Sequence, residues 1–565
     1  MEKAQFKKNT FSLLSDDINV NTFTPEDLAD EGELIAKTTE QFVKQEVVPK
    51  LDCIEDHDYD VSRQLFQKAG ELGLLSIEVP EKYDGLDLGK TVSGLVAEKM
   101  GYGGSFSVSF NIHAGVGTLP YVYFGTDEQK KKFLPKLGSG EWIGAYALTE
   151  PDAGSDALSA KTSAILNSEG TKWILNGEKQ WITNAHMADV YVTFAKTNKG
   201  MTAFLVERAF EGVSIGIEEK KMGIKGSSTA TLILEDVQVP VENVLGEVGK
   251  GHHVALNILN LARLKLAFSN IGTAKQAIGL SVQYGKERKQ FQKELVDFKM
   301  IQEKLANMII YTYGAESAAY RTAGLLDEAI DEGGNITEQL SSYAMECAIN
   351  KVKSSEALGF VVDEAVQIHG GYGYMQEYEV ERLYRDARIS RIFEGTNEIN
   401  RLTIAKMLLK KSQHSEEKEF GVEKNRNHRY IQLSKQLLQK SLKTLSQAIE
   451  VKVDEEQEYL RVLSDMAKDV YVMESAFLRT EKVLQNEGEE KARIKQLITD
   501  VLCEEGYRQI EEYAVCVISA AMQDEQKKQM LLDEIRHLSV PLYSNLFMKK
   551  REIAKSSIKR DRYFV

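Results

Sequence analysis

The spacing of apolar residues changes along this chain, and that change restricts its fold more than any other feature of the sequence. Residues 26–145 show apolar side chains at the spacing of amphipathic helices. Residues 146–250 instead contain short β-rich runs between turn signals, and the helical spacing returns after Gly246. Helix, sheet and helix in this order predict an α+β fold that is mainly α, with an antiparallel sheet formed by the middle of the chain.

Local signals predict where several elements begin and end. Thr24-Pro25-Glu26-Asp27 combines an N-cap threonine, a proline at the first helical position and acids in the first turn, so we expect a helix to begin there. Asn176-Gly177 and Asn198-Lys199-Gly200 are turn signals between strands. Asp331-Glu332-Gly333-Gly334 is the one clear interruption expected in the helices after the sheet. The apolar positions behind these predictions are Leu34, Phe42, Val47, Leu65, Ala69, Leu72 and the runs 172–175, 190–194, 203–206 and 231–234.

Beyond about residue 410 the sequence predicts an additional module. A polar linker at 411–427 precedes a helical domain at 428–565, which follows a helical domain at 26–145, a β domain at 146–250 and a second helical domain at 251–410. The helical stripes of the last domain contain Leu460, Leu463, Met466, Val470, Met473 and Phe477, then Ile494, Leu497 and Val501.

The C-terminus is strongly basic. It carries Lys549, Lys550, Arg551, Lys555, Lys559, Arg560 and Arg562. A charge run of this kind is typical of a solvated helix face, and attraction to an anionic membrane surface is the alternative.

Charge and cysteine usage exclude several classes of protein. The formal net charge is −14, whereas residues 411–565 carry 27 Lys and Arg against 27 Asp and Glu, so the excess of acid precedes residue 411. This distribution argues against nucleic-acid binding. The four cysteines form no C-x-x-C pair, so we expect reduced thiols and no metal site.

The sequence shows no secretory signal, and one segment needs separate consideration as a membrane span. Residues 100–126 contain no Asp, Glu, Lys or Arg. Glycines, Pro120, Asn111 and His113 interrupt the segment, so a buried helix and loop is the better interpretation.

Several common catalytic signatures are absent, which leaves four unusual clusters. G-x-G-x-x-G, G-x-S-x-G and H-E-x-x-H do not occur, which argues against a Rossmann site, an α/β-hydrolase and a metalloprotease. The remaining clusters combine glycine, hydroxyl and aromatic residues, and they lie at 146–156, 179–184, 367–374 and 388–399.

From the residues alone, each cluster has a structural and a functional interpretation. The first is either a turn or a loop whose backbone N–H groups hold an anionic or heteroaromatic ligand. Trp181 and Thr183 lie on one face of a strand, although an isolated tryptophan is usually a core residue. Glu394, between Phe393 and Gly395, is expected on a tight turn where partial burial would raise its basicity.

Taken together, the clusters resemble the flavin-dependent acyl-CoA dehydrogenases. The matching segments are T-E-P-D-A-G-S-D (149–156), Q-W-I-T-N (180–184), K-M-G-I-K-G-S (221–227), E-R-K-Q-F (287–291), Q-I-H-G-G-Y-G-Y (367–374) and R-I-F-E-G-T-N-E-I (391–399). The resemblance covers 26–410 and implies an N-terminal helical domain, a middle antiparallel β domain and a C-terminal four-helix bundle. The extra helical domain is similar to that of the very-long-chain branch.

The resemblance implies FAD as cofactor and a fatty acyl-CoA, of long chain in that branch, as substrate. Glu394 would remove the α-proton of the thioester while the β-hydrogen leaves as hydride to flavin N5, in fatty acid β-oxidation. Some relatives carry the base just before the arginine that matches Arg263, where this chain has Ala262. Glu394 therefore has no rival for this role.

The resemblance also assigns binding residues. Trp181 would pack against the isoalloxazine, and Arg288, Phe291 and the 367–371 loop would reach the FAD of a neighbouring subunit, which implies at least a homodimer. The implied cofactor contacts are Tyr146, Leu148, Thr149, Gly154, Ser155, Trp181, Ile182, Thr183, Arg288, Phe291, Gln367, Ile368, Gly370, Gly371, Thr396 and Glu398. The implied substrate contacts are Ser155, Asn260, Arg263 and Gly395, while His369 and the His252-His253 pair are interpreted as structural.

Partners and alternatives follow from the same resemblance. An electron-transferring flavoprotein is the expected electron acceptor, in the cytoplasm, with possible membrane contact through the basic C-terminus. Two alternatives stay open: an acyl-CoA oxidase that passes electrons to oxygen, and a catalytically weak family member that acts as a binding or assembly scaffold.

Overall fold

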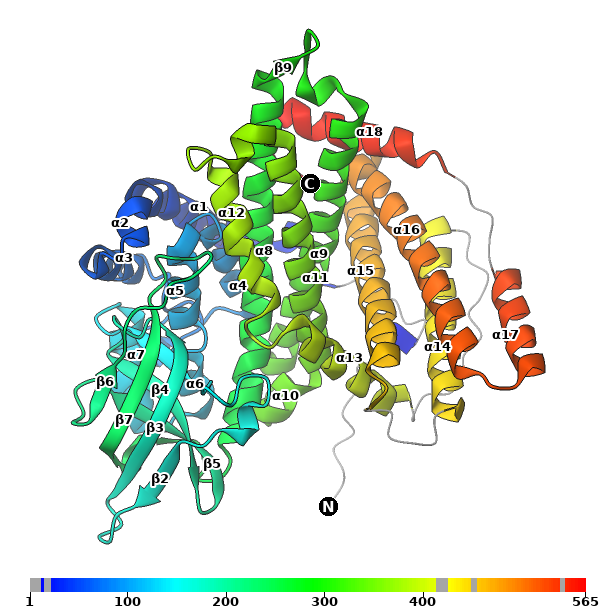
Figure 1. Cartoon of the computed structure of the whole chain (residues 1–565). Coiled ribbons are helices and arrows are strands. Elements are labelled where there is room, and N and C mark those ends of the chain that lie inside the picture. The colour runs from blue at the N-terminus through cyan, green and yellow to red at the C-terminus, as the bar shows by residue number, and fades with distance from the viewer. Residues whose placement is uncertain (1–11, 15–21, 413–424, 449–454, 539–543) are drawn as a thin grey trace.

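The computed structural model describes residues 12–14, 22–412, 425–448, 455–538 and 544–565. Most of the linker predicted at 411–427 lies outside these residues. Figure 1 shows the sheet and the first helices on one side of the long central helices, and most of the last helices of the chain on the other side.

Seven α-helices precede the sheet within the described residues. They are α1 (Asp30–Phe42), α2 (Leu51–Glu55), α3 (Tyr59–Glu71), α4 (Lys90–Met100), α5 (Gly104–Ala114), α6 (Leu119–Phe124) and α7 (Asp127–Gly138). The helix predicted to begin at Thr24 is only a three-residue 3-10 turn, because the extended backbone of Leu28 ends it before α1. The segment 100–126 folds as α5 and α6 with the intervening loop, and Ser105 and Ser109 are buried there. Two of the apolar residues that indicated these helices, Leu34 and Leu72, are 64% and 45% exposed.

The middle of the chain forms one sheet. Its strands are β1 (Gly144–Ala147), β2 (Ser163–Leu166), β3 (Lys172–Thr183), β4 (Val190–Thr197), β5 (Gly200–Glu207), β6 (Val213–Ile215), β7 (Thr229–Pro240) and β8 (Val244–Leu245), in the order β6-β7-β3-β2-β4-β5-β8 with β1 beside β4. The sheet is not purely antiparallel, because β1 and β2 both pair with β4 in parallel.

The two predicted turns in the sheet have different outcomes. Asn198-Lys199-Gly200 connects β4 to β5 as predicted. Asn176-Gly177 is instead a bulge within β3, where the register with β7 shifts between Leu175 and Gly177. Gly177 has a φ of +149°, and a Cβ there would lie 2.5 Å from Thr162 Oγ1, so the close approach requires glycine.

Long helices return after the sheet. They are α8 (Gly251–Glu287), α9 (Lys299–Asp331), α10 (Ile336–Ser342), α11 (Ala344–His369), α12 (Glu379–Ala387) and α13 (Asn397–Ser412). The break at 331–334 is confirmed, but Tyr343 also separates α10 from α11, and three longer breaks occur. They contain the hairpin β9 (Lys289–Gln290) and β10 (Lys293–Glu294) and the 3-10 helices Gly370–Tyr374 and Arg388–Arg391. All three coincide with segments that carry the sequence motifs.

Beyond α13 the described residues form five further helices, of which the second, third and fifth pack directly on α9. They are α14 (Arg426–Ala448), α15 (Gln457–Glu487), α16 (Glu489–Ala521), α17 (Glu525–Leu538) and α18 (Leu546–Arg560). The predicted stripe from Leu460 to Phe477 is confirmed, since its six members are at most 6% exposed. The core is continuous across the junction, because Ile309 of α9 shares one apolar cluster with Leu437 and Val470.

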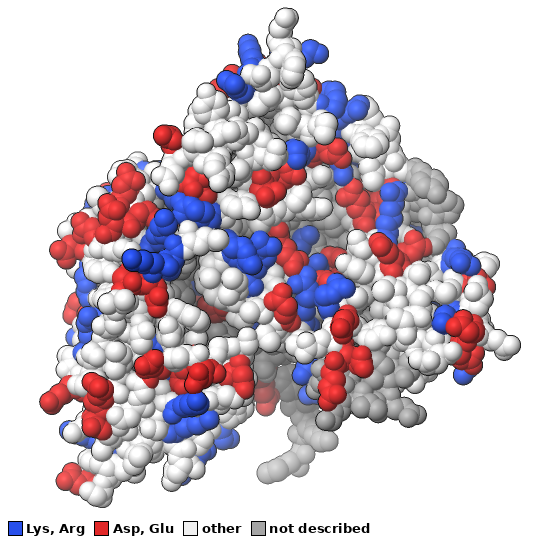
Figure 2. Space-filling view, viewed as in Figure 1, with Lys and Arg blue, Asp and Glu red and all other residues white. Residues whose placement is uncertain are grey.

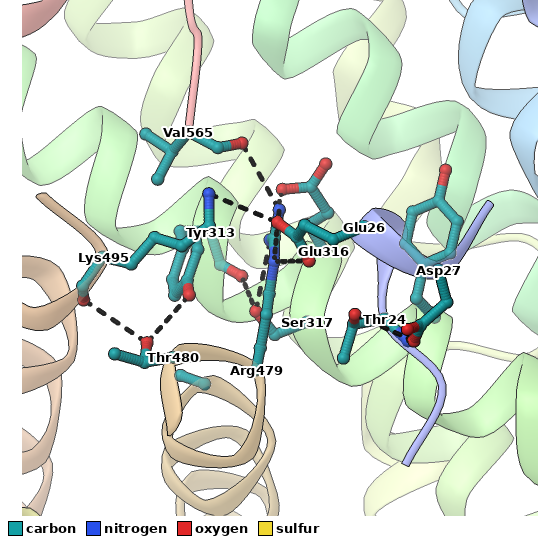
Figure 3. A network of polar contacts seen from close by, with 12 residues as sticks. Thr24, Glu26, Asp27, Tyr313, Glu316, Ser317, Arg479, Thr480, Lys495 and Val565 are labelled. Carbon is teal, nitrogen blue, oxygen red and sulfur yellow. Dashed lines mark hydrogen bonds and ion pairs between the residues drawn. The ribbon is translucent and has the colours of Figure 1, made fainter. Parts of the chain in front are cut away.

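A buried ionic network joins the two ends of the chain to α9 and α15 (Figure 3). The Arg479 guanidinium donates to both Glu26 carboxylate oxygens at 2.8–3.0 Å and to Glu316 Oε2 at 2.7 Å. Tyr563 near the C-terminus also donates to Glu316 Oε2, at 2.7 Å. The network connects the additional helices to the rest of the molecule by charge as well as by apolar packing.

The basic C-terminal run is partly paired inside the molecule. Lys549 Nζ lies 2.6 Å from Asp500 Oδ2, and Lys550 Nζ lies 2.7 Å from Glu505 Oε1, both acids being on α16. Lys550 is 8% exposed, so the run is not simply a solvated face. Figure 2 shows acidic and basic side chains intermixed on the face it presents.

Two further sequence predictions concern cysteines and membrane spans. Cys53 and Cys516 are exposed, Cys347 and Cys503 are buried, and all four are free thiols. In the described ranges, no helix combines the length and the hydropathy needed to cross a bilayer.

Candidate active site

The loop between Arg391 and α13 places Glu394 at the centre of the site. Glu394 has a φ of +56° and Gly395 a φ of +80°, so two consecutive residues occupy the left-handed region. This conformation is unfavourable for glutamate and persists only where neighbouring contacts enforce it. The tight turn predicted here is confirmed.

Three buried side chains hold this turn by its carbonyl groups. Arg263 Nε donates to Glu394 O at 3.1 Å, and Lys351 Nζ donates to Gly395 O at 2.8 Å. Asn400 Nδ2 donates to Gly395 O at 2.8 Å and to Thr396 O at 3.0 Å. Donors from α8, α11 and α13 therefore fix the direction of the Glu394 side chain.

A mainly apolar cavity of about 40 Å³ lies beside Glu394. Its walls come from α5, the loop after α5, α8 and Phe393, and they are Val108, Asn111, Ile112, Val116, Ala262, Lys265, Leu266, Ser269, Phe393 and Glu394. Burial raises the pKa of Glu394, and the positive charges of Arg263 and Lys351 oppose this rise. The arrangement gives a carboxylate of increased basicity facing an apolar space.

Tyr146 brings the sheet to this loop. Burial raises the pKa of the Tyr146 phenol well above its usual value, and the negative charge of Glu394 adds to the rise. The ring contacts Phe194 edge-on at 5.1 Å, and the hydroxyl donates to Ala255 O of α8 at 3.5 Å. Tyr146, a predicted cofactor residue, therefore lies close enough to Glu394 for the charge of this predicted base to affect the pKa of its phenol.

The predicted flavin-binding tryptophan is a surface residue and not part of the core. Trp181 is 59% exposed and has a φ of +56°, at a second register shift in β3 between Lys179 and Ile182. Ile182 is buried beneath it, and Thr183 is partly buried. A bulge that turns a large aromatic ring outward is typical of a binding surface.

The neighbouring loop 149–156 is exposed at Gly154 and Ser155 and is held to the sheet through Thr149 and Glu150. Gly154 and Ser155 are exposed, and a Cβ at Gly154 would meet nothing within 4 Å. The carboxylate of Glu150 is engaged internally, with Lys179 Nζ at 2.6 Å. Thr149 O accepts from Gln180 N at 2.8 Å, which ties this loop to the bulge of Trp181. Leu148 is buried beneath the loop.

Five of the other predicted cofactor residues line a separate cavity of about 650 Å³. Its wall includes Arg288, Gln367, Ile368, Gly370 and Gly371. The cavity volume is within the range of ligand sites. Phe291 is not in this wall; it is 87% exposed on the hairpin turn between β9 and β10.

The Glu394 loop and the second cavity are separated along α11. Lys351 contacts the Glu394 loop and His369 ends the helix at the second cavity, and 18 residues of helix between them span about 27 Å. The His369 ring stacks on Tyr284 at 4.2 Å and its Nδ1 lies 2.7 Å from Ala365 O.

The predicted substrate contacts face the interior of the base loop. Arg263 and Asn260 are 8% and 5% exposed, and Arg263 Nη1 donates to Asn260 Oδ1 at 3.0 Å. Thr396 Oγ1 accepts from Ile399 N at 3.2 Å at the start of α13, and Glu398 is exposed. In this arrangement Arg263 donates a hydrogen bond to the Glu394 carbonyl, and its charge lowers the pKa of the Glu394 carboxyl group.

Sequence reasoning missed Lys351 and Asn400, which hold the base loop. Lys351 is fully buried within the apolar stretch Ala348-Ile349-Asn350-Lys351-Val352. A lone lysine at a core position of a helix is a usable signal, because lysine is almost never fully buried without a partner.

Comparison with known proteins identifies the family. Models of the acyl-CoA dehydrogenase N-terminal, middle and C-terminal domains match residues 29–141, 145–237 and 249–409, and a further acyl-CoA dehydrogenase C-terminal domain model matches 443–537. A probable acyl-CoA dehydrogenase of Bacillus subtilis is 46% identical over 100% of this chain and 99% of its own length. The very long-chain specific acyl-CoA dehydrogenase of Bos taurus mitochondria is 34% identical over 90% of this chain and 82% of its own.

A solved structure agrees with these matches. The crystal structure of an acyl-CoA dehydrogenase complexed with FAD from Bacillus anthracis has a TM-score of 0.95 and 46% identity, and covers 98% of this chain and 99% of its own. Family models, relatives and fold together show that this chain belongs to the acyl-CoA dehydrogenases, a family of FAD-dependent oxidoreductases.

Proposed function

We propose that this enzyme dehydrogenates a fatty acyl-CoA between the α and β carbons, with Glu394 as the base that removes the α-proton. The observation that carries the proposal is the position of Glu394, a carboxylate of raised pKa on an enforced turn beside an apolar cavity. A general base needs this combination of increased basicity, fixed direction and low water access.

The residues of the chain fit FAD. The exposed Trp181 and the open Gly154 leave room for a large planar group. Bound FAD supplies the acceptor for the hydride that leaves the β-carbon. We propose that Trp181 and Thr183 flank its ring and that Tyr146, Leu148, Thr149, Gly154, Ser155, Ile182, Thr396 and Glu398 lie along it.

The chain itself prepares the acyl group for deprotonation. Val108, Ile112 and Val116 form an apolar wall that excludes water from the acyl chain. The backbone N–H of Glu394 is the protein donor proposed for the thioester carbonyl, where negative charge develops as the α-proton leaves. Arg263 keeps that N–H and the carboxylate in place by holding the carbonyl of the same residue.

A second copy of the chain is part of the proposal. The cavity around Arg288 and Gly370 lies at His369, and the helical residues between His369 and Lys351 at the Glu394 loop span about 27 Å, so this group would serve the cofactor of a partner subunit. We propose at least a homodimer, an electron-transferring flavoprotein as electron acceptor and a cytoplasmic location. Long acyl chains, and contact of the basic C-terminal helix with membranes, complete the proposal.

Anaerobic addition of palmitoyl-CoA to the holoenzyme tests the chemistry. Wild type should lose its flavin absorbance, Glu394→Gln should bind FAD and palmitoyl-CoA without this loss, and Glu394→Asp should be slow, since the carboxylate is withdrawn by one methylene. Retained reduction in Glu394→Gln would remove Glu394 from its role. No reduction of the wild type by any acyl-CoA would favour the scaffold alternative.

Two further measurements separate the finer points. Reoxidation with air or with an electron-transferring flavoprotein distinguishes oxidase from dehydrogenase, because rapid peroxide formation would contradict the dehydrogenase. A turnover series from butyryl-CoA to stearoyl-CoA tests chain length, and a maximum at butyryl-CoA would contradict the long-chain proposal.

A further inference from the structure

Lys351 is a buried charge that the proposed reaction does not yet use. It lies about two turns into α11 and its side chain is fully buried. Its Nζ donates to Gly395 O at 2.8 Å and to Asn397 Oδ1 at 2.7 Å, and both acceptors are neutral. Within the described residues, this ammonium group forms no ion pair with a carboxylate.

A neutral donor would hold this turn at a lower cost in desolvation. Removing an ammonium group from water costs several kcal/mol, and neutral acceptors return only part of this. Asn400 shows that an amide is sufficient to hold the same carbonyl, since its Nδ2 also donates to Gly395 O at 2.8 Å. The positive charge of Lys351 therefore calls for an explanation beyond hydrogen bonding.

Glu394 is the anion that acts most strongly on this lysine. Burial lowers the pKa of Lys351 to about 7, and the largest influence opposing this decrease is the charge of Glu394. In return, the charge of Lys351 opposes the rise in the pKa of Glu394. The two charges therefore favour each other's ionised form across the base loop.

We propose that Lys351 is a positioning residue that holds the base loop by Gly395 and, through its charge, sets the pH above which Glu394 works as a base. The inference rests on the proposed role of Glu394. A cation near a carboxylate favours the ionised form, so loss of the Lys351 charge raises the pKa of Glu394. Activity should then need a higher pH.

The other groups around the pair do not substitute for this charge. Arg263 of α8 also lowers the pKa of Glu394, but a guanidinium stays charged over the whole working range. Lys265 lines the same cavity and lies 3.3 Å from the carboxylate of Glu78, and Tyr146 stays neutral. On the Lys351 side, the remaining charged groups that act on it are Glu356 of α11 and Glu398 of α13.

The experiment compares three substitutions at this position in the FAD-loaded enzyme. Lys351→Met removes the charge and the donors, Lys351→Gln removes the charge and keeps an amide donor, and Lys351→Arg keeps the charge. Lys353→Met is the matched control, since Lys353 is a partly buried lysine on the same helix whose Nζ lies over the Tyr311 ring at 5.1 Å.

The readout is the acid limb of the pH profile of kcat/KM. The limb should move up by about one pH unit in Lys351→Met and Lys351→Gln, stay near the wild-type position in Lys351→Arg, and not move in Lys353→Met. A second readout is the anaerobic exchange of the substrate α-hydrogens with deuterium, which follows the base without dehydrogenation. Its pH dependence should shift equally.

Each other outcome overturns the inference. An unmoved limb in Lys351→Gln would show that the charge does not act on the base, and an equal shift in Lys351→Arg would assign the effect to geometry. If Lys351→Gln and Lys351→Met both fail to retain FAD, the lysine belongs to the structure of the loop, and the proposal fails as well. Failure of the proposed function is distinguishable, because Glu394→Gln would then exchange α-hydrogens as fast as wild type.

Discussion

Replacing Arg479 with methionine tests how strongly the additional helices are joined to the body of the enzyme. The Arg479 side chain is 2% exposed and is shared by Glu26 and Glu316, which come from opposite parts of the chain (Figure 3). Removing one partner of a buried ionic cluster leaves an uncompensated charge and typically costs about 3–5 kcal/mol. Among the described residues, Glu316 would keep Lys275 and Tyr563 as partners.

The pKa of Glu26 gives an independent magnitude. Burial tends to raise this pKa, but Arg479 and Lys495 more than offset it and lower the pKa from 4.5 to about 2. This shift corresponds to about 3.4 kcal/mol at most, and to roughly 2 kcal/mol after screening at a side chain that is 21% exposed. Because the folded pKa is depressed, this stabilisation is present above pH 4.5 and is lost as pH falls toward 2.

Native-state hydrogen exchange of the amides of α9 and α15 measures the effect in a protein too large for two-state analysis. At pH 7 we expect about a thousandfold faster exchange in Arg479→Met than in wild type, corresponding to about 4 kcal/mol. Arg493→Met is the control, since its side chain is 67% exposed and it pairs with Glu552 at the surface. Exchange in Arg479→Met as slow as in the control would refute the reasoning, and so would a Glu26 carboxyl whose pKa, followed by NMR, does not rise in the variant.

Three further predictions follow from single sites. Gly395→Ala should reduce turnover and shift the base loop, because a β-carbon at a φ of +80° costs about 1–2 kcal/mol and would lie 3.4 Å from the guanidinium of Arg263. Turnover and thermal unfolding of the holoenzyme measure this effect, and wild-type values for both would contradict the prediction. Burial lowers the pKa of His113 to about 4, so wild type should lose up to about 3.4 kcal/mol of stability as pH falls from 6.5 to 4. The His113→Gln variant should lose less stability over this range, and unfolding measured at each pH tests the difference. Burial raises the pKa of Cys347 to about 12, so this thiol should react with a thiol reagent at pH 8 only after the protein unfolds. The buried Cys503 should behave in the same way, and rapid modification of all four thiols would contradict this prediction.

Helical periodicity predicted the core where the contacts are local. The stripe from Leu460 to Phe477 is buried as expected, since its apolar period alone determines which face turns inward. Leu34 and Leu72 continue a similar period and are exposed. Whether another element of the fold covers a given helical turn depends on tertiary packing, and the spacing of apolar residues carries no information about it.

The site could be predicted only in part, because its decisive contacts join distant segments. Gly395 in the sequence indicates a turn at Glu394. The turn is held, however, by Arg263 and Lys351, which lie 131 and 44 residues along the chain from the carbonyl groups they contact. Trp181 was ambiguous for the same reason. Its exposure results from a register shift between β3 and β7, and such a shift depends on strand pairing and not on local propensity.

The continuous core decides how the C-terminal helices should be studied. Ile309 and Ile349 of the central helices share one apolar cluster with Leu437 and Val470 of the added ones. Truncation near residue 425 would therefore expose apolar surface on α9, and the exposed surface would bind liposomes whether or not the native protein does. Membrane contact should instead be tested in the full chain, with Lys555→Glu and Lys559→Glu on the last helix. Wild-type binding to anionic vesicles that falls in this variant, with unchanged unfolding, would support an anchor, and equal binding would exclude one at these residues.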